Sequence, residues 1–282
     1  MRFWTTCTSV ALLGVALISA GATDRRAKEL FDKPPKLSAD FSRLLERAEN
    51  GEPVAQFEVG LSHETGVGSN QDYAEAARWY RKAADHGSPG AQNNLGGLYS
   101  RGLGVQHDDV EAVRWYLRAA LEGYPAAENN VGYMYANGRG VPRDTAAAVT
   151  WYKKAAAQGY AAAETNLGFM YQTGRGLPLD INQAIQWYGR AAKRGYAPAQ
   201  YNLGLVYLNN SIVQDINEAV HWLQLAADHG LAEAQNELGL LYEHGQGVVQ
   251  NYKVAVKWYG LAAEQGSAEA RRNYEALAAS HP

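Results

Sequence analysis

The fold is decided by the stretch from Ala127 to Ala162, AENNVGYMYANGRGVPRDTAAAVTWYKKAAAQGYAA, because the rest of the chain repeats it. The tryptophans set the register, with spacings of 36, 36, 36, 35 and 36 residues between Trp79, Trp115, Trp151, Trp187, Trp222 and Trp258. An alanine pair and a glycine follow each tryptophan at a fixed distance. A self-similar period of this length is typical of a solenoid. The buried positions of such a scaffold define its architecture, and its exposed positions choose the ligand.

Each unit holds two helical patterns, and the six units begin near Ala55, Ala91, Ala127, Ala163, Ala199 and Ala234. In the first pattern Ala127, Val131 and Tyr135 fall on one face, and the small Gly132 lets a neighbouring helix approach. The second pattern begins at a residue whose side chain caps free helical amides, namely Asp72, Asp108, Asp144, Asp180, Asp215 or Asn251. It carries the tryptophan and ends at a glycine suited to the left-handed conformation. The prediction is an all-α chain of helix-turn-helix repeats.

Half-units are expected at both ends of the repeat array. Residues 38–50 are in register with the second half of a unit and predict an N-terminal capping helix. Six repeats then occupy residues 51–269, and residues 270–282 repeat the first-helix pattern as a C-terminal capping helix and tail. The ends of an open solenoid need such caps. We therefore expect an α/α solenoid of six repeats of about 36 residues with half-repeat caps.

The N-terminal residues 1–22 have the pattern of a secretory signal peptide. Arg2 precedes an apolar stretch, and Ala20-Gly21-Ala22 fits an A-x-A site with cleavage after Ala22. Residues 23–37 contain Pro34-Pro35 and predict a linker. The alternative is an uncleaved anchor, since Phe3 to Ala22 could just span a bilayer. We expect cleavage and a periplasmic or secreted protein. Membrane attachment is expected only if the signal peptide is not cleaved.

Composition and motifs exclude several classes of function. The net charge is −3 with both signs spread along the chain, so no basic stripe favours nucleic-acid binding. The seven histidines form neither H-x-x-x-H nor H-E-x-x-H, and neither S-x-x-K nor G-x-S-x-G occurs. We therefore expect no catalytic residue, no metal and no cofactor. The only cysteine, Cys7, lies within the predicted signal peptide, and we expect a monomer without disulfides.

The repeated pattern A-x-x-x-L-G-x-x-Y-x-x-G-x-G-V-x-x-D-x-x-x-A-x-x-W-Y-x-x-A-A-x-x-G resembles the Sel-one-like repeat family, a relative of the tetratricopeptide repeat. Residues 91–123 match it almost throughout, and the resemblance covers roughly residues 50–280. The resemblance implies an α/α right-handed superhelix that acts as a scaffold or adaptor. Bacterial members with signal peptides are often periplasmic or secreted. The fifth unit departs from the pattern, because YLNNSIVQD lacks both loop glycines and one residue, which predicts a break in curvature near residues 208–214.

The six tryptophans allow two interpretations. Aromatic side chains can form a platform for carbohydrates, but a helical stripe beside alanines is typical of a core. We expect all six to be core residues, so that Trp151→Ala would cost about 3–5 kcal/mol through a cavity.

Two adjacent positions of the first helix are candidates for binding a partner. Asn94, Asn130, Asn166 and Asn202 share one position, with Glu58 and Glu237 in the flanking units. In tetratricopeptide-like scaffolds this helix lines the concave face, where an asparagine can bond the backbone of an extended peptide. The alternative is that each asparagine bonds a neighbouring helix and stabilises the stack. The preceding position holds a variable row, Phe57, Asn93, Asn129, Thr165, Tyr201 and Asn236.

A third row lies one turn further along, at Leu61, Gly97, Tyr133, Phe169, Leu205 and Leu240. Aromatic side chains exposed in a groove are candidate anchors because such residues dominate interface energy. Burial against the next unit is the alternative. The candidate partner-binding residues are therefore Asn93, Asn94, Asn129, Asn130, Tyr133, Asn166, Phe169, Tyr201 and Asn202.

The functional prediction is a non-enzymatic scaffold that binds a protein or peptide in its groove, either regulating an envelope signalling protein or contacting host proteins. The alternative is an envelope-assembly scaffold for peptidoglycan or exopolysaccharide machinery. A third hypothesis is a hydrolase, because some cysteine-rich relatives have been associated with β-lactam binding or hydrolysis. Those relatives carry disulfides in each repeat that this chain lacks.

Overall fold

The computed structural model describes residues 39–281, which form fourteen α-helices and no strand. The predicted signal peptide and linker, residues 1–22 and 23–37, lie outside the described residues. The chain divides into two compact units at Gln158 and Gly159. No helix among residues 39–281 combines the length and the apolar character of a membrane span.

The first unit begins with a lone helix, α2 (Ala39–Glu49), followed by three helix pairs. The pairs are α3 (Pro53–Thr65) with α4 (Tyr73–Asp85), α5 (Pro89–Arg101) with α6 (Asp109–Leu121), and α7 (Pro125–Asn137) with α8 (Thr145–Ala157). We call the first helix of each pair the A helix and the second the B helix. Helix α2 packs on α3 through an apolar cluster that includes Phe41, Ala48 and Val59.

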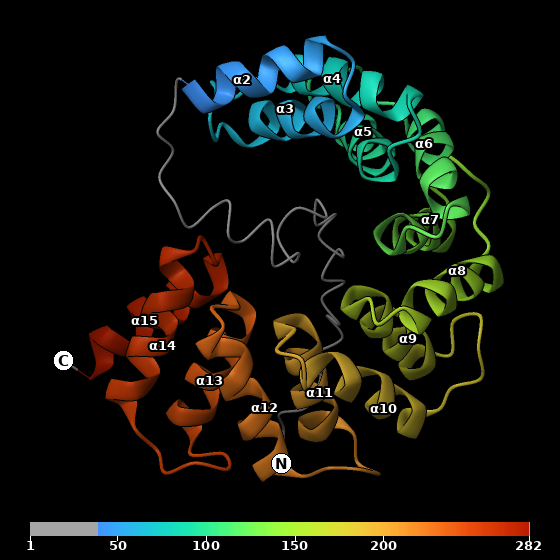
Figure 1. Ribbon diagram of the computed structural model, residues 1–282. Coiled ribbons are helices and arrows are strands. Elements are labelled where there is room, and N and C mark those ends of the chain that lie inside the picture. Colours follow the sequence, from blue (N-terminus) through green and yellow to red (C-terminus); the bar gives the residue numbers. More distant parts are fainter. Residues whose placement is uncertain (1–38, 282) are drawn as a thin grey trace. The chain divides into compact units, whose positions relative to one another are not determined.

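The second unit also holds three pairs, followed by a lone A-type helix, α15 (Ala268–Ser280). The pairs are α9 (Ala161–Thr173) with α10 (Ile181–Ala192), α11 (Ala197–Asn209) with α12 (Ile216–Asp228), and α13 (Ala232–His244) with α14 (Tyr252–Glu264). Within each unit, A helices line one side of the stack and B helices the other (Figure 1). This confirms the predicted all-α helix-turn-helix solenoid.

The helix ends form for the reasons that the sequence suggests. Every B helix starts after an acidic or asparagine cap; the Asp72 carboxylate, for example, accepts from the amides of Ala74 and Glu75 at 2.9 and 3.0 Å. The loop between the A and B helices is tight. Gly104, at φ +67°, has no room for a side chain, because a Cβ there would lie 2.1 Å from the carbonyl carbon of Tyr73. The loop of one pair therefore rests on the first turn of the preceding B helix.

The main core contact within a pair joins a B-helix ring to an A-helix glycine. Tyr80, Tyr116, Tyr188 and Tyr259 are fully buried, and Tyr152 nearly so. A Cβ on Gly132 would lie 2.7 Å from the Tyr152 ring, and a Cβ on Gly96 would lie 2.9 Å from the Tyr116 ring. The glycine therefore brings the helix backbone against the aromatic face. Burial raises the pKa of these phenols, including Tyr152 and Tyr188.

The tryptophans are less buried than the sequence predicts. Trp79 and Trp115 are buried, but the other four, Trp151, Trp187, Trp222 and Trp258, are only half-buried. The tryptophan precedes the core tyrosine by one residue, so it points about 100° away around the helix. A cation covers several of the indole rings; the Nζ of Lys154 lies 4.0 Å from the Trp151 ring centroid. Trp151 and Trp222 still pack against the core clusters of their units, so the prediction that all six belong to the core is confirmed only in part.

The fifth pair differs from the others where its sequence is shorter. Helix α11 ends at a C-cap, Asn210, with φ −92°, where the other A helices of the pairs end at a left-handed glycine. The Asn210 side chain accepts from the Ile212 amide at 3.0 Å, which closes the loop without glycine. Leu223 replaces the core tyrosine and still packs on Gly204. A break in the solenoid's curvature at this point stays a prediction.

Two variants separate the core role of the tyrosine from that of its neighbour. Tyr152→Ala removes a buried ring and should lower the free energy of unfolding by about 3–5 kcal/mol. Trp151→Ala should cost no more than about half of that, because the indole is half-buried. Urea denaturation followed by circular dichroism measures both values. An equal or larger loss for Trp151→Ala would contradict this assignment of the core.

Candidate functional site

The predicted partner-binding residues lie on the A helices α5, α7, α9 and α11, and most of them are buried. Asn93 and Asn94 are 2% and 4% exposed, and Asn129, Asn130, Asn166 and Tyr201 are also buried. Tyr133, Phe169 and Asn202 are half-buried. Tyr133, Phe169 and Asn202 therefore offer more surface to a partner than the six buried residues do.

Three of the asparagines belong to a chain of hydrogen bonds that crosses the first unit. Tyr80 Oη donates to Glu64 Oε2 at 2.6 Å, and Asn94 Nδ2 donates to Tyr80 Oη at 3.1 Å. The series of hydrogen bonds continues as Asn93 Nδ2 donates to Asn94 Oδ1 at 3.2 Å and Asn130 Nδ2 donates to Asn93 Oδ1 at 2.9 Å. It links α3, α4, α5 and α7. Because these amides bond one another, they stabilise the stack.

The second unit repeats the last of these bonds. Asn273 Nδ2 on α15 donates to Asn236 Oδ1 on α13 at 3.0 Å, across the same 37 residues that separate Asn93 from Asn130. Asn129, Asn166 and Tyr201 also interact with other residues. A backbone-binding role for the asparagine row stays a prediction, and a peptide would have to compete with these internal bonds.

A second polar row, which the sequence reasoning missed, lies two residues before the asparagine position. Its members are all buried: Gln56, Gln92, Glu128, Glu164, Gln200 and Gln235. Each glutamine donates to an alanine carbonyl near the end of the preceding helix, which is α2 for Gln56 and a B helix for the others, as from Gln235 Nε2 to Ala227 O at 3.2 Å. These glutamines therefore cap the C-terminal end of one helix while they belong to the A helix that follows it.

The other side of this row meets a residue just after the following B helix. His229 Nδ1 lies 2.8 Å from Gln200 Oε1, Gln265 Nε2 donates to Gln235 Oε1 at 2.8 Å, and Gln158 Nε2 donates to Glu128 Oε2 at 2.8 Å. Glu164 pairs in the same way with Arg194. The sequence contains a signal for these bonds, because glutamine or glutamate recurs 29 or 30 residues before histidine, glutamine or arginine.

One member of the row lacks its partner. Gln92 Oε1 is buried and accepts no hydrogen bond from residues 39–281, and the residue 30 positions later is Glu122, whose carboxylate cannot donate one. A buried acceptor without a partner costs about 1–3 kcal/mol. The second pair is therefore weaker at this point than its neighbours.

Glu122→Gln should supply the missing donor. We expect the free energy of unfolding to rise by about 1 kcal/mol, because the new amide can reach Gln92 Oε1 as Gln158 reaches Glu128. Thermal and urea denaturation measure the change. Glu122→Ala is the matched control, since it removes the same negative charge without adding a donor. A gain as large in the alanine variant would show that charge, and not the hydrogen bond, is responsible.

Glu237 occupies the asparagine position in the sixth repeat, and the pKa of its carboxyl group is raised. Burial, followed by the nearby Glu269 carboxylate on α15, raises its pKa from 4.5 to about 6. The pKa of Tyr259 on α14 is also raised, first by burial and then by the Glu243 carboxylate that accepts its hydrogen bond. The folded chain thus holds a proton on Glu237 over a range of pH in which the unfolded chain has released it.

This shift predicts that stability falls as pH rises from 4.5 to about 6, since the raised carboxyl pKa favours the protonated folded chain at low pH. Glu237→Gln mimics the protonated form and should be more stable than the native chain by up to about 2 kcal/mol at pH 7. The difference should vanish below pH 4.5. Urea denaturation of both proteins across this range, with exposed Glu264→Gln as control, tests it. A difference that does not change with pH would contradict the assignment.

The third predicted row remains accessible. Leu61, Gly97 and Tyr133 in the first unit, and Phe169, Leu205 and Leu240 in the second, are all half-buried. Tyr133 and Phe169 pack partly against the core clusters of their own units. We call these six residues the A-helix apolar row. Each A helix presents one of them at the same point, next to the buried polar network.

The loop arginines differ from each other. Arg139 donates to both Asp109 oxygens, at 3.0 and 2.7 Å, and to the Ser100 carbonyl at 2.9 Å, so it fastens the third pair to the second. These bonds to Asp109 raise the pKa of the Arg139 guanidinium. Arg175 is exposed, and its guanidinium lies 5.4 Å from the centroid of the Phe169 ring. Within the described residues Arg175 has no carboxylate partner, so it adds a positive charge beside the apolar row.

Residues 39–281 contain no group of three or more acidic, histidine or cysteine side chains placed to hold a metal ion. The A helices offer apolar contacts and hydrogen bonds along one side of each stack.

The Sel1 repeat family matches six consecutive segments of the chain, which are residues 53–88, 89–124, 125–160, 161–196, 197–231 and 232–267. The chain belongs to the Sel1 repeat family. Sel1 repeat proteins are commonly protein-interaction scaffolds and are typically non-catalytic. The matched segments start at the first residue of each A helix, and the family assignment made from the tyrosine, glycine and tryptophan pattern is confirmed.

Solved structures of bacterial Sel1 repeat proteins resemble this one. A Sel1 repeat protein from Oxalobacter formigenes is 36% identical, with a TM-score of 0.71, over 83% of this chain and 68% of that one. The immunity protein Pa5087 from Pseudomonas aeruginosa is 21% identical, with a TM-score of 0.55, over 85% of this chain and 87% of that one. The second likeness is one of fold alone. No curated protein sequence gives a significant match.

Proposed function

We propose that this Sel1 repeat protein is a non-enzymatic scaffold that binds a protein or peptide along its A-helix apolar row. The observation that carries the proposal is the pairing of that row with the polar network beside it. Half-exposed apolar side chains recur at one position of the A helices, except at Gly97 in α5, while the adjacent Asn93 and Asn130 are buried and bonded to one another.

The physical basis is a preorganised surface. The internal hydrogen bonds from Glu64 to Asn130 fix the spacing between α3, α5 and α7 before any partner arrives. Little conformational entropy is then lost on binding. Tyr133 and Phe169 are the natural anchors, since aromatic side chains supply much of the energy of an interface. Arg175 beside Phe169 would favour an acidic group on the partner.

The cellular setting belongs to the same proposal. Residues 1–22 support export to the periplasm or secretion, with cleavage after Ala22, and the chain would then contain no cysteine. In that compartment the scaffold would regulate an envelope signalling protein or contact host proteins. An envelope-assembly role at peptidoglycan or exopolysaccharide machinery is the second candidate, and a hydrolase is the third.

Site-specific photocrosslinking tests the proposal. A photoreactive phenylalanine analogue placed at Tyr133 or at Phe169, in the native host, should crosslink one dominant protein. The same analogue at Leu121, which is 76% exposed on B helix α6, should not. Tyr133→Ala and Phe169→Ala should each weaken capture of that protein by about tenfold or more.

Crosslinking from Leu121 with the same yield, or capture that survives both alanine variants, would contradict the assignment of the surface. Glycan or wall fragments at Tyr133 would favour the envelope-assembly role. The intact mass of the purified protein reports separately on export, because cleavage after Ala22 removes residues 1–22.

A further inference from the structure

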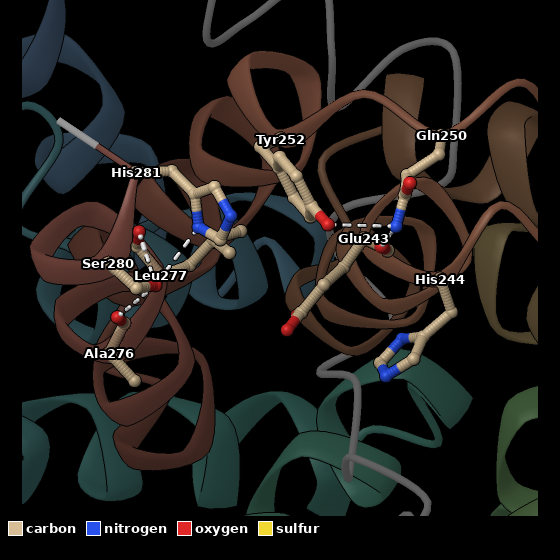
Figure 2. A pocket seen from close by; sticks show the side chains of 8 residues that line it. All are labelled: Glu243, His244, Gln250, Tyr252, Ala276, Leu277, Ser280 and His281. Carbon is tan, nitrogen blue, oxygen red and sulfur yellow. Dashed lines mark hydrogen bonds between the residues drawn. The ribbon is translucent and has the colours of Figure 1, made fainter.

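A surface pocket of about 280 Å³ lies at the C-terminal end of the second unit, between the end of α13, the start of α14 and the end of α15. Figure 2 shows the Glu243 side chain extending into this space, with Tyr252 and His281 together on one side and His244 on another. The pocket is remote in sequence from Tyr133 and Phe169. It is therefore a candidate site independent of the A-helix apolar row.

The walls of the pocket are held in place by contacts within the unit. The rings of Tyr252 and His281 stack with their centroids 3.8 Å apart and their planes tilted by 31°. Gln250 Nε2 donates to Tyr252 Oη at 3.0 Å and to the Glu243 carbonyl at 2.8 Å. Leu277, which is buried, closes the apolar side.

The carboxylate of Glu243 is only half satisfied. Its Oε2 accepts from the buried Tyr259 hydroxyl at 2.6 Å. Its Oε1 accepts no hydrogen bond from any residue in the described part of the chain. A fixed, partly buried carboxylate with one free oxygen favours a donor that brings positive charge.

The first helix pair contains the same arrangement with its donor present. Tyr80 Oη donates to Glu64 Oε2 at 2.6 Å, and Gln71 Nε2 donates to Tyr73 Oη at 3.0 Å and to the Glu64 carbonyl at 2.9 Å. These three bonds match those of Tyr259, Gln250 and Glu243. In the first unit, however, Glu64 Oε1 also accepts from the Arg101 guanidinium at 3.0 Å.

The difference comes from one position of the following A helix. Arg101 is the last residue of α5 and lies 37 residues after Glu64, while Ser280 is the last residue of α15 and lies 37 residues after Glu243. The Ser280 hydroxyl donates within α15, to the Ala276 carbonyl at 3.0 Å. The volume that a guanidinium fills beside Glu64 is therefore part of an open pocket beside Glu243.

We propose that this pocket binds an arginine side chain presented by another polypeptide. The guanidinium donates to Glu243 Oε1, in the way that Arg101 donates to Glu64, and its plane lies against the paired Tyr252 and His281 rings. Arginine fits better than lysine because a planar fork both stacks on a ring and reaches a carboxylate. A polypeptide is the source that the internal precedent supports, since Arg101 is itself a side chain at a helix end.

Titration of the purified protein with N-acetyl-arginine N-methylamide tests the site by nuclear magnetic resonance of its backbone amides. Saturable shifts should centre on Ser280 and His281, with a Kd on the order of 1–10 mM. The matched lysine compound should bind at least about threefold more weakly. Glu243→Gln, whose amide oxygen still accepts from Tyr259, should weaken binding at least about tenfold, whereas Glu264→Gln should not.

Ser280→Arg provides a second, opposite test. The new guanidinium should fill the pocket from within, abolish binding of the capped arginine and raise the melting temperature by about 2–4 °C. Shifts that persist in Glu243→Gln or in Ser280→Arg would overturn the proposal. Equal binding of the lysine compound would do so too, and tighter binding of agmatine than of the capped arginine would rule out a polypeptide source. None of these results depends on whether the A-helix apolar row binds a partner.

Discussion

The packing of a B-helix ring on an A-helix glycine is the contact on which the rest of the structure depends. Tyr152 on Gly132 and Tyr116 on Gly96 leave no space for even a methyl group between helix and ring. Glycine in the middle of a helix costs about 1 kcal/mol of helix propensity relative to alanine, so the contact must return more than that through buried aromatic surface. The close approach sets the distance between the two helices of a pair.

With that distance set, polar side chains can bridge successive pairs. Gln200 and Gln235 each join the end of one B helix to the residue after the next B helix, and the Asn93 and Asn130 amides meet across neighbouring A helices. Such bonds between buried groups demand a fixed register, because an unpaired buried amide costs more than a good bond contributes. The A-helix apolar row lies on the same helices and therefore has the same fixed register. A partner would then meet side chains whose positions are already determined.

Much of the fold could be predicted from the sequence because its signals are local. The caps at Asp72 and its equivalents and the left-handed glycines each act within one helix pair, and the 36-residue period repeats them along the chain. These signals place the helices correctly. The choice between Trp151 and Tyr152 as core residue could not be made in this way, because adjacent residues both fall within a broad apolar stripe. Only the glycine opposite, Gly132, shows which ring enters the core.

The site was harder to predict, since its contacts join different helices, through residues 14 to 37 positions apart. Asn94 was a candidate for binding a peptide backbone, and its bond to Tyr80 appears only when the helices are stacked. The open Glu243 pocket was missed for the same reason. Its absent partner is visible only by comparison with Glu64 and Arg101.

The glycine beneath the ring offers the most direct measurement. Gly132→Ala would place a Cβ 2.7 Å from the Tyr152 ring, whereas Gly97→Ala, on the open side of α5, would meet only Arg101 and the Tyr116 hydroxyl at 3.6 and 3.7 Å. Both changes raise helix propensity equally. The account predicts that urea denaturation finds Gly132→Ala less stable by about 2 kcal/mol or more and Gly97→Ala unchanged or more stable by up to about 1 kcal/mol. A Gly132→Ala protein as stable as the Gly97→Ala protein would contradict it.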